Sequence, residues 1–438
     1  MKNIYKNLMK ALYACFLLGY MVVSAQLTVM GVGNYSVGGI SDGGIVSMQT
    51  SDGQIYKWDE INGLVQIGAI SNGYPAAGRT LITADGTKIG SSVTNSLTTF
   101  NEISTYDIGT SAWTSHGGLV ASGWDGHVSS TWGMTPDGNT IVGLGWVTAG
   151  SAHAVKWDAA NGVTDLGSSI AGSSSRANAI NSDGTVIVGW QDQADGTRSG
   201  AKWVNGVQSF ITDSNGNYVG EAGDVSADGS TIIGSTMPDP YVWNSVTGLT
   251  YITHPNSSFF FSGGATGISA DGKKVIGFYR PFAAPPMSGE GFIWTAAGGR
   301  VNLNDYAVSL GINTQGVTMS LPLAMSHDGL RIAGVGTNAS GQIVAFYLNL
   351  SEVQLSTHEN TIQNNSISVY PNPAKEILYF KGINEIDKAE IYNMVGQKVK
   401  TFSAVKGSID ISSLSKGNYI LQIFVKGENS QSFKFIRQ

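Results

Sequence analysis

Short apolar segments alternate with polar turns along most of the chain, and one turn recurs. In its best-formed copy, residues 226–229 (Ser-Ala-Asp-Gly) precede the apolar run 231–234 (Thr-Ile-Ile-Gly). Asp-Gly between apolar segments is typical of a tight hairpin, because glycine accepts positive φ and aspartate hydrogen-bonds nearby backbone N–H groups. The β-branched residues after the turn favour a strand that is buried on both faces.

This turn recurs about once every 45 residues. Seven copies can be counted, with the aspartates Asp42, Asp85, Asp137, Asp183, Asp228, Asp271 and Asp328. Most copies continue into an apolar strand that ends in tryptophan, and then into a further strand after a glycine. Four short strands per unit at this period predict an all-β fold, a seven-bladed β-propeller.

The two ends of the repeat region complement each other. The last copy accounts for three strands, whereas residues 27–32 form an apolar segment that belongs to no copy. Pairing this segment with the last copy would remove two open sheet edges. We therefore expect the ring to close through a strand shared between the two ends.

The two recurring motifs together resemble the HAF family of extracellular repeats. That family pairs an Ile-Ser-x-Asp-Gly-x-x-Ile-x-Gly segment with an aromatic strand, and the resemblance covers about residues 36–350. The second copy departs most, with Tyr106 where other copies have tryptophan. The resemblance implies a propeller of HAF-like repeats that works outside the cytoplasm.

The composition changes at residue 367, where lysine becomes frequent and alternating strands predict a small β-sandwich over 367–438. This region resembles the type A C-terminal sorting domain of the type IX secretion system of Gram-negative bacteria. The motif residues are Tyr370, Pro371, Asn372, Pro373, Gly396, Gly417, Tyr419 and Lys434. The resemblance implies recognition by the secretion translocon, and a location outside the cell or on the outer-membrane surface.

Two further segments complete the predicted domain organisation. Residues 1–25 have a lysine-containing start, an apolar core and a small-residue site before Gln26, which predicts a cleaved signal peptide. Residues 351–366 are polar and predict a linker between the propeller, at 26–350, and the sorting domain. The signal and the sorting domain together predict a secreted or surface-displayed protein.

Charge and cysteine content exclude several classes of function. Residues 26–350 contain 12 basic and 23 acidic side chains, whereas residues 367–438 contain 10 basic and 6 acidic ones. An acidic repeat region argues against a nucleic-acid partner. The single cysteine, Cys15, lies in the predicted signal peptide, so the mature chain can form neither a disulfide nor a thiolate metal site.

No catalytic, metal or cofactor site is expected from the motifs. Each repeated aspartate stands without the clustered oxygens that calcium requires, and the histidines lack metal-ligand spacing. Asp125, Glu221 and Glu290 are spare acids in loops, but nothing in their spacing pairs them for acid–base catalysis.

Aromatic residues outside the repeated positions are the candidates for ligand contact, because loops on a rigid ring often carry binding residues. They are Trp113, Trp124, Trp132, Trp146, Trp190, Tyr279 and Phe282. We expect a binding or adhesion protein for an extracellular ligand such as a glycan or a protein. The alternative is an extracellular polysaccharide hydrolase or lyase on the same scaffold.

Overall fold

The structure, a computed structural model, describes residues 26–74, 77–148, 150–285, 288–351, 368–381, 383, 385–393, 398–425 and 431–438. The chain divides into two compact units, Met1–Ser351 and Glu352–Gln438. We call them the repeat unit and the C-terminal unit. The predicted signal peptide, residues 352–366 of the predicted linker and Gly396 lie outside the described residues.

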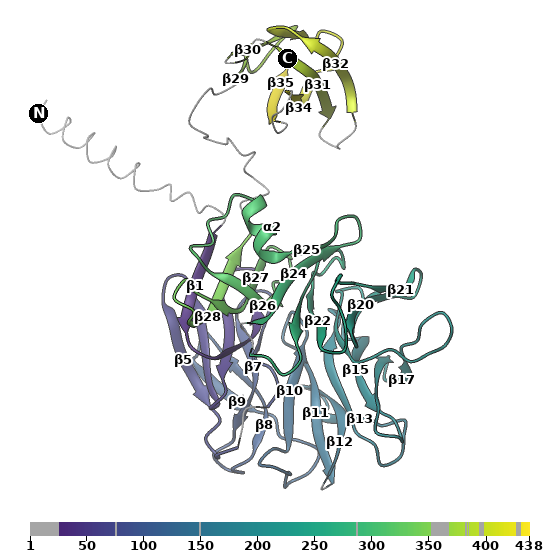
Figure 1. The fold of residues 1–438 in the computed structure, drawn as a ribbon. Coiled ribbons are helices and arrows are strands. Elements are labelled where there is room, and N and C mark those ends of the chain that lie inside the picture. Colours follow the sequence, from purple (N-terminus) through teal and green to yellow (C-terminus); the bar gives the residue numbers. More distant parts are fainter. Residues whose placement is uncertain are drawn as a thin grey trace, which may run out of the picture. The chain divides into compact units, whose positions relative to one another are not determined.

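The repeat unit consists of four-stranded antiparallel sheets, and in six of them the strands are neighbours in chain order (Figure 1). The first sheet contains β2 Tyr35–Ile40, β3 Val46–Thr50, β4 Gln54–Asp59 and β5 Gly63–Ala69. The second contains β6 Leu81–Ile82, β7 Lys88–Thr94, β8 Asn101–Asp107 and β9 Ala112–Ser115. The third contains β10 Ser129–Met134, β11 Thr140–Thr148, β12 Ser151–Asp158 and β13 Gly162–Gly167. The fourth sheet contains β14 Ser175–Ile180, β15 Val186–Asp192, β16 Arg198–Val204 and β17 Val207–Phe210. The fifth contains β18 Ala222–Val225, β19 Thr231–Thr236, β20 Asp239–Asn244 and β21 Gly248–Tyr251. The sixth contains β22 Phe261–Ile268, β23 Val275–Pro281, β24 Glu290–Thr295 and β25 Gly299–Asn302. The all-β prediction is confirmed.

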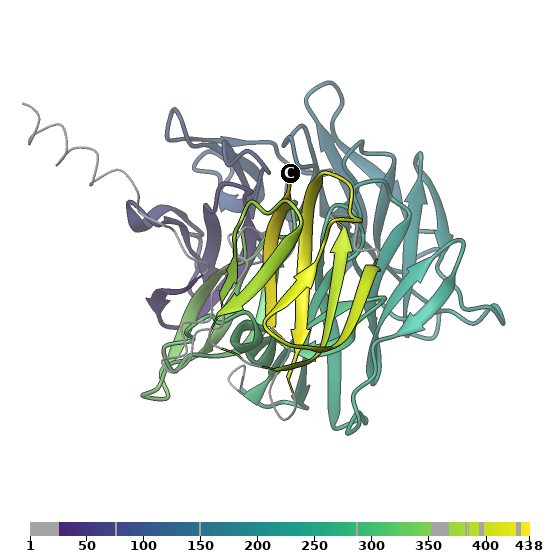
Figure 2. The same ribbon diagram turned by 90° about the horizontal axis from the view of Figure 1, so that it is seen from above.

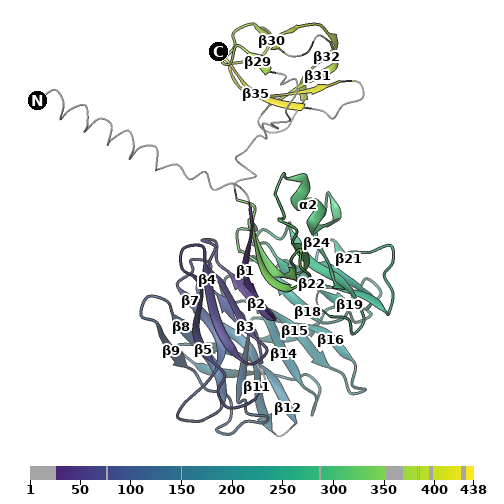
Figure 3. The same cartoon turned by 60° about the vertical axis from the view of Figure 1, so that its left-hand side comes forward.

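The seventh sheet joins the two ends of the repeat unit. It contains β26 Thr318–Met325, β27 Arg331–Thr337 and β28 Ile343–Asn349, and its outer strand is β1 Gln26–Val32. β1 runs antiparallel to β28, with Leu27 opposite Leu348 and Val32 opposite Val344. Figures 2 and 3 show the purple start and the light-green end of the unit side by side. The predicted pairing of residues 27–32 with the last copy is confirmed.

Each sheet packs against the next one, and the seventh packs against the first through β26, β27 and β2. One hydrophobic cluster spans this closing contact and includes Met30, Val37, Trp58 and Tyr347. The Trp58 and Tyr347 rings lie 5.0 Å apart at 47°. The aromatic residue that ends the third strand of a sheet therefore packs between sheets. Tyr106 of the second sheet is buried at the corresponding position.

The recurring turn is held by a serine or threonine and the aspartate two residues later. In the fifth sheet, the Ser226 hydroxyl donates to Asp228 Oδ1 at 2.6 Å and accepts from the backbone N–H of Thr231 at 3.0 Å. The backbone N–H of Ser230 also donates to Asp228 Oδ1, at 3.0 Å. Gly229 has φ +75°, which a residue with a side chain rarely adopts. The pKa of Asp228 is lowered, and the hydrogen bond from Ser226 is the largest cause.

The turns are also bonded to one another around the inner edge of the sheets. The backbone N–H of the residue before aspartate donates to the carbonyl of the corresponding residue in the next sheet, as in Ala84 to Pro136 at 2.8 Å and Ala227 to Ala270 at 3.0 Å. Pro136 has no N–H and cannot continue this series. A separate contact joins the fourth and seventh turns, where the Ser182 hydroxyl lies 3.3 Å from His327 Nε2.

Asp42 has a different role from the other six aspartates, which is a correction to the repeat alignment. Its backbone N–H donates to the carbonyl of Ala84 at 2.9 Å. Asp42 therefore takes the place of the residue that precedes the aspartate in the other turns. Its Oδ1 accepts from the backbone N–H of Asp328 at 2.9 Å. The first turn is one residue shorter than the others, and the side chain of Asp42 now links the last turn to the first.

A short helix, α2 (Leu303–Ser309), follows the sixth sheet. Its N-cap is Asn302, whose side chain accepts from the N–H groups of Asn304 and Asp305. The helix begins directly after β25, which ends at Asn302. No helix among the described residues is both long and apolar enough to cross a membrane.

The C-terminal unit has two antiparallel sheets. One contains β29 Ser368–Tyr370, β30 Ile377–Lys381 and β33 Ser408–Asp410; the other contains β32 Lys398–Val405, β31 Ile386–Asn393, β34 Gly417–Phe424 and β35 Gln431–Arg437. Their inward residues form one core, which includes Leu378, Ile391, Leu421 and Phe435. Period-two alternation supplies this core, since β30 alternates between exposed and buried positions throughout.

We expect that removing β1 destabilises the repeat unit strongly. A chain that begins at residue 33 lacks β1, so the edge of β28 would be exposed and the closing cluster would lose Met30. All ten tryptophans lie between residues 58 and 294, so tryptophan fluorescence of the full chain reports only on the repeat unit. The shortened chain should melt at least about 5 °C lower than the chain that begins at Gln26. Val29→Thr, an exposed change within β1, is the control, and equal melting temperatures for all three chains would contradict closure by β1.

Candidate functional site

Two of the predicted ligand-contacting aromatics are buried, so this expectation is corrected for them. Trp190 is 4% exposed and Tyr279 is 0% exposed. The Tyr279 hydroxyl donates to Asp239 Oδ1 at 2.7 Å and also bonds the carbonyl of Ile252. Burial raises the pKa of Tyr279 far above its usual value. Both residues lie near the C-terminal end of the second strand of a sheet, Trp190 in β15 and Tyr279 in β23.

Three further candidates are half-buried and are held by the protein itself. The indole N–H of Trp113 donates to the carbonyl of Ile67 at 2.7 Å, which joins the first two sheets. The indole N–H of Trp132 donates to the hydroxyl of Ser130 at 2.9 Å. Trp146 lies near the end of β11, and its backbone N–H bonds the carbonyl of Val128. These side chains contribute to packing and leave only part of their surface to a ligand.

The exposed candidates lie at one end of the repeat unit. Because strands alternate in direction, the Asp-Gly turns share one end, while the connections between sheets and between second and third strands share the other, which we call the loop end. Trp124 and Phe282 lie in loop-end connections and are 53% and 59% exposed. Phe259 and Phe260, in the loop-end connection before the sixth sheet, are 60% and 72% exposed.

The three phenylalanines Phe259, Phe260 and Phe282 form one exposed cluster, which we call the phenylalanine cluster. Phe259 and Phe260 meet edge to face at 5.3 Å, and Phe259 and Phe282 stack at 6.0 Å and 26°. The backbone N–H of Phe282 donates to the carbonyl of Phe260 at 2.8 Å, which fixes the two loops together. Aromatic surface that is exposed and held by backbone bonds is suited to contact with a partner.

The three spare acids lie in different places, and each faces a basic group. Glu221 pairs with Arg176 at 2.7 Å, and Glu290 pairs with Arg300 at 2.8 Å. Asp125 Oδ1 lies 3.3 Å from His127 Nδ1. No two of these acids form a carboxylate pair, and among the described residues no group of acidic, histidine or cysteine side chains could hold a metal ion. Glu221 and Glu290 are therefore structural ion-pair partners in this fold.

Glu221 belongs to a stack of alternating rings and guanidinium groups across the third to fifth sheets. Arg176 lies 3.5 Å over the Trp132 ring, and Arg198 lies 3.5 Å over the Trp190 ring. Glu221 accepts from both Arg176 and Asn178, at 2.7 and 2.8 Å. Burial lowers the pKa of Arg176 to about 10, although Glu221 opposes this shift. The stack fastens three sheets together near the loop end.

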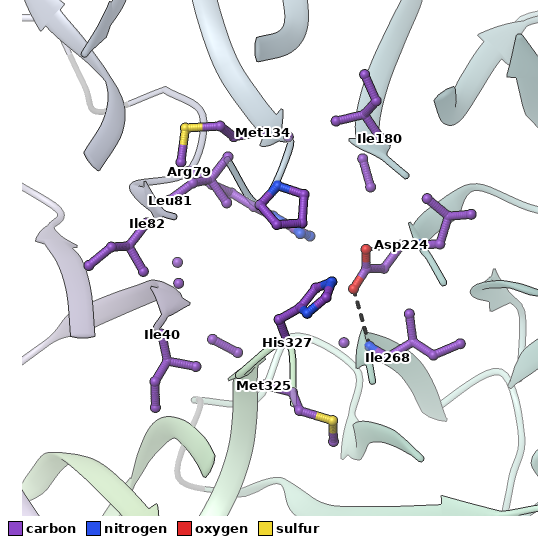
Figure 4. Close-up of a pocket in the computed structure, with 18 of the residues that line it drawn as sticks. Ile40, Arg79, Leu81, Ile82, Met134, Ile180, Asp224, Ile268, Met325 and His327 are labelled. Atoms are coloured by element: carbon purple, nitrogen blue, oxygen red, sulfur yellow. Dashed lines mark hydrogen bonds between the residues drawn. The ribbon is translucent and has the colours of Figure 1, made fainter. Parts of the chain in front are cut away.

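A cavity of about 160 Å³ occupies the centre of the repeat unit (Figure 4). The inner strands of all seven sheets line it: β2, β6, β10, β14, β18, β22 and β26. Its wall combines polar groups with apolar side chains, and the apolar ones include Ile40, Leu81, Ile82, Met134, Ile180, Ile268 and Met325. Three charged or titratable side chains, Arg79, Asp224 and His327, point into it from the second, fifth and seventh repeats.

Asp224 is held at the cavity wall by backbone donors. Its Oδ1 accepts from the N–H of Val225 at 2.8 Å, and its Oδ2 accepts from the N–H of Ile268 at 3.1 Å. Burial raises the pKa of Asp224 to about 6, although these hydrogen bonds and the charges of Arg79 and His327 oppose the rise. Asp224 is thus the most strongly perturbed carboxyl in the cavity, and the sequence motifs did not single it out.

A signal for the cavity residues does exist in the repeats. Asp224 stands two residues before the turn serine, where the other copies have Gly39, Leu81, Gly133, Ala179, Gly267 and Ala324. His327 stands directly before the turn aspartate, where most other copies have alanine, proline or serine. A search for polar residues at positions that are otherwise small or apolar would have found both.

Comparisons with known proteins identify the C-terminal unit. Residues 368–438 match the secretion system C-terminal sorting domain, so this part of the chain is such a domain and directs export by the type IX system to the cell surface or extracellular space. No curated protein sequence matches the chain.

Several solved structures are similar to this chain at low sequence identity. The β-propeller domain of the Trilobed protease from Pyrococcus furiosus matches at 12% identity with a TM-score of 0.45, over 79% of this chain and 100% of that one. TolB from Acinetobacter baumannii matches at 14% identity with a TM-score of 0.40, over 72% of this chain and 80% of that one. A chain of the Mitotic Checkpoint Complex matches at 13% identity with a TM-score of 0.45, over 74% and 93%.

The raised pKa of Asp224 predicts a specific dependence of stability on pH. Its folded-state pKa lies above the unfolded value, so its contribution is most favourable at low pH and is lost as pH rises through about 6. Relative to wild type, Asp224→Asn should gain up to about 3 kcal/mol of unfolding free energy between about pH 4 and 7. Tryptophan-monitored denaturation at several pH values measures this difference.

The control is Asp195→Asn, in an exposed turn where a hydrogen bond from Thr197 lowers the pKa of the carboxyl. Its difference from wild type should change only at low pH, and with the opposite sign. Parallel pH profiles for Asp224→Asn and wild type would show that Asp224 titrates in the folded protein as it does in the unfolded chain.

Proposed function

We propose that the repeat unit is a seven-bladed β-propeller of HAF-type repeats, with each four-stranded sheet as one blade. Three observations support this: the sheets contact one another in order, the last contacts the first, and one cavity is lined by every inner strand. The C-terminal unit is on this proposal a small β-sandwich, because its two sheets share a single core. Residues 26–350 and 367–438 are then the two domains.

The function that this arrangement supports best is binding outside the cell. The sorting domain takes the chain to the cell surface or extracellular space. There the propeller binds an extracellular ligand, such as a glycan or a protein, through its loop end. The phenylalanine cluster carries this proposal, because rings that are 59–72% exposed and fixed by a backbone bond have no structural role of their own.

Catalysis on a polysaccharide receives less support from the site. A hydrolase or lyase requires acids placed together with access to substrate. Glu221 and Glu290 are instead engaged by Arg176 and Arg300, and Asp125 lies in a separate loop. Trp124, which is exposed beside Asp125, is accordingly a second contact residue of a binding surface.

We expect that binding depends on the phenylalanine cluster. The mature full chain should be retained on at least one member of a panel of immobilised polysaccharides and extracellular matrix proteins. Changing Phe259, Phe260 and Phe282 together to alanine should weaken that retention at least tenfold, since buried aromatic contacts dominate such interfaces. The measurement is a binding isotherm on the retained material.

The matched control replaces two exposed apolar residues at the turn end, Ile61 and Val246, which are 93% and 89% exposed. Ile61→Ala with Val246→Ala removes exposed apolar side chains but leaves the loop end intact, so retention should not change. Equal loss in both variants would assign retention to general hydrophobicity. Release of reducing ends that Asp125→Asn abolishes would favour the enzyme instead.

Passage across the outer membrane should depend on the C-terminal unit alone. A chain that ends at residue 351 should accumulate in the periplasm as a folded repeat unit, because the two compact units have separate cores. Residues 351–438 fused to an unrelated periplasmic protein should carry that protein outside. Fractionation with an envelope-integrity marker measures both, and normal secretion of the truncated chain would contradict this dependence.

A further inference from the structure

The central cavity contains an arginine that lacks a partner of its own. Arg79 lies two residues before β6, the inner strand of the second sheet, and its backbone N–H donates to the carbonyl of Thr131 at 2.7 Å. Within the described part of the chain, no acceptor is hydrogen-bonded to its guanidinium and no carboxylate lies within ion-pair distance. The contrast with Arg176 is clear, because Arg176 has Glu221, Asn178 and Trp132 around it.

The acidic side chain of the cavity wall is Asp224, from the fifth repeat. Asp224 interacts electrostatically with Arg79, but the two groups form no salt bridge in the structure. Both carboxylate oxygens of Asp224 accept one backbone N–H each, which leaves further lone pairs directed at the cavity. The cavity therefore presents a cationic donor from Arg79 and an anionic acceptor from Asp224, and both side chains point into the same space (Figure 4).

We propose that the central cavity binds a small α-amino acid in its zwitterionic form. The ligand carboxylate would meet the Arg79 guanidinium, and the ligand ammonium would meet Asp224. A zwitterion matches both charges and leaves the cavity neutral, whereas a simple anion or cation would add an unbalanced charge to the cavity. A short aliphatic side chain would lie against residues such as Leu81 and Ile268.

The size of the cavity sets the size of the ligand. A volume of about 160 Å³ is smaller than the pockets of about 300–1,000 Å³ that hold drug-sized molecules. It has room for several waters, and thus for a molecule of roughly five to ten heavy atoms. Glycine, alanine and serine fall within this range, and a disaccharide does not.

The turn end restricts entry to the cavity. The backbone bonds between successive turns surround that mouth, and the contact of Ser182 with His327 Nε2 crosses it at 3.3 Å between the fourth and seventh repeats. The loop end is therefore the route by which a ligand would enter. This site is distinct from the phenylalanine cluster, which lies in surface loops of the sixth repeat.

The test measures binding of defined small molecules to the mature full chain by calorimetry and by tryptophan-monitored melting at pH 7.5. The probes are glycine, alanine and serine, with acetate and glycolate as anions without an ammonium group and methylamine as the cation alone. The amino acids should raise the melting temperature by at least about 2 °C at saturation. Acetate, glycolate and methylamine should not.

Arg79→Gln and Asp224→Asn should each weaken amino-acid binding at least about tenfold, as expected for the loss of a charge-assisted hydrogen bond. Arg280→Gln, which removes an arginine near Phe278 outside the cavity, is the control and should bind as wild type does. Arg79→Lys keeps the charge and tests the site if the glutamine variant folds poorly; it should retain part of the affinity. Three outcomes would overturn the proposal: no response to any amino acid, an equal response to glycolate, or binding that is unchanged in both cavity variants.

Discussion

The hydrogen bond between a turn hydroxyl and the aspartate two residues later is the interaction on which the repeat unit depends. It appears as Thr83 to Asp85, Thr135 to Asp137 and Ser269 to Asp271, at 2.6–2.7 Å. By fixing the turn, it also fixes the peptide group just before the aspartate, which bonds the neighbouring turn. One local interaction thus sets both the hairpin within a sheet and the spacing between sheets. A protein without disulfides needs such a repeated constraint, because ring closure is its remaining global restraint.

The repeat pattern was sufficient to predict the architecture because each of its signals is local. The Asp-Gly turn, the tryptophan strand and the unpaired segment at 27–32 each specify a neighbour a few residues away or a missing edge. They predicted an all-β fold of four-stranded units and the partner of β1. Asp42 was misaligned because its turn is one residue shorter, and an Asp-Gly pair in the wrong register reads the same in sequence as one in the right register.

The candidate sites were harder to predict, since residue type does not reveal which way a side chain points. Tyr279 and Phe282 are three residues apart and both are aromatic, yet one is fully buried and the other is 59% exposed. The difference arises where β23 ends, at Pro281, so an error of one or two residues in a strand boundary reverses the assignment. Arg79, Asp224 and His327 come together only after the ring closes, and no window of sequence contains two of them.

The departures from repeat symmetry are therefore the most informative positions in this fold. A ring of similar units builds a cavity whose wall is the same in every unit, and small or apolar residues fill it at little cost. Placing a carboxyl there costs free energy, as the raised pKa of Asp224 shows. The equivalent positions in other sheets hold glycine, alanine or leucine, so the repeated fold does not require a carboxyl there, although Asp224 also accepts the backbone N–H of Ile268 from the next sheet. A carboxyl that is costly to bury, at a position that is small or apolar in the other sheets and in one cavity with an arginine without a partner of its own, is the arrangement expected of a binding site.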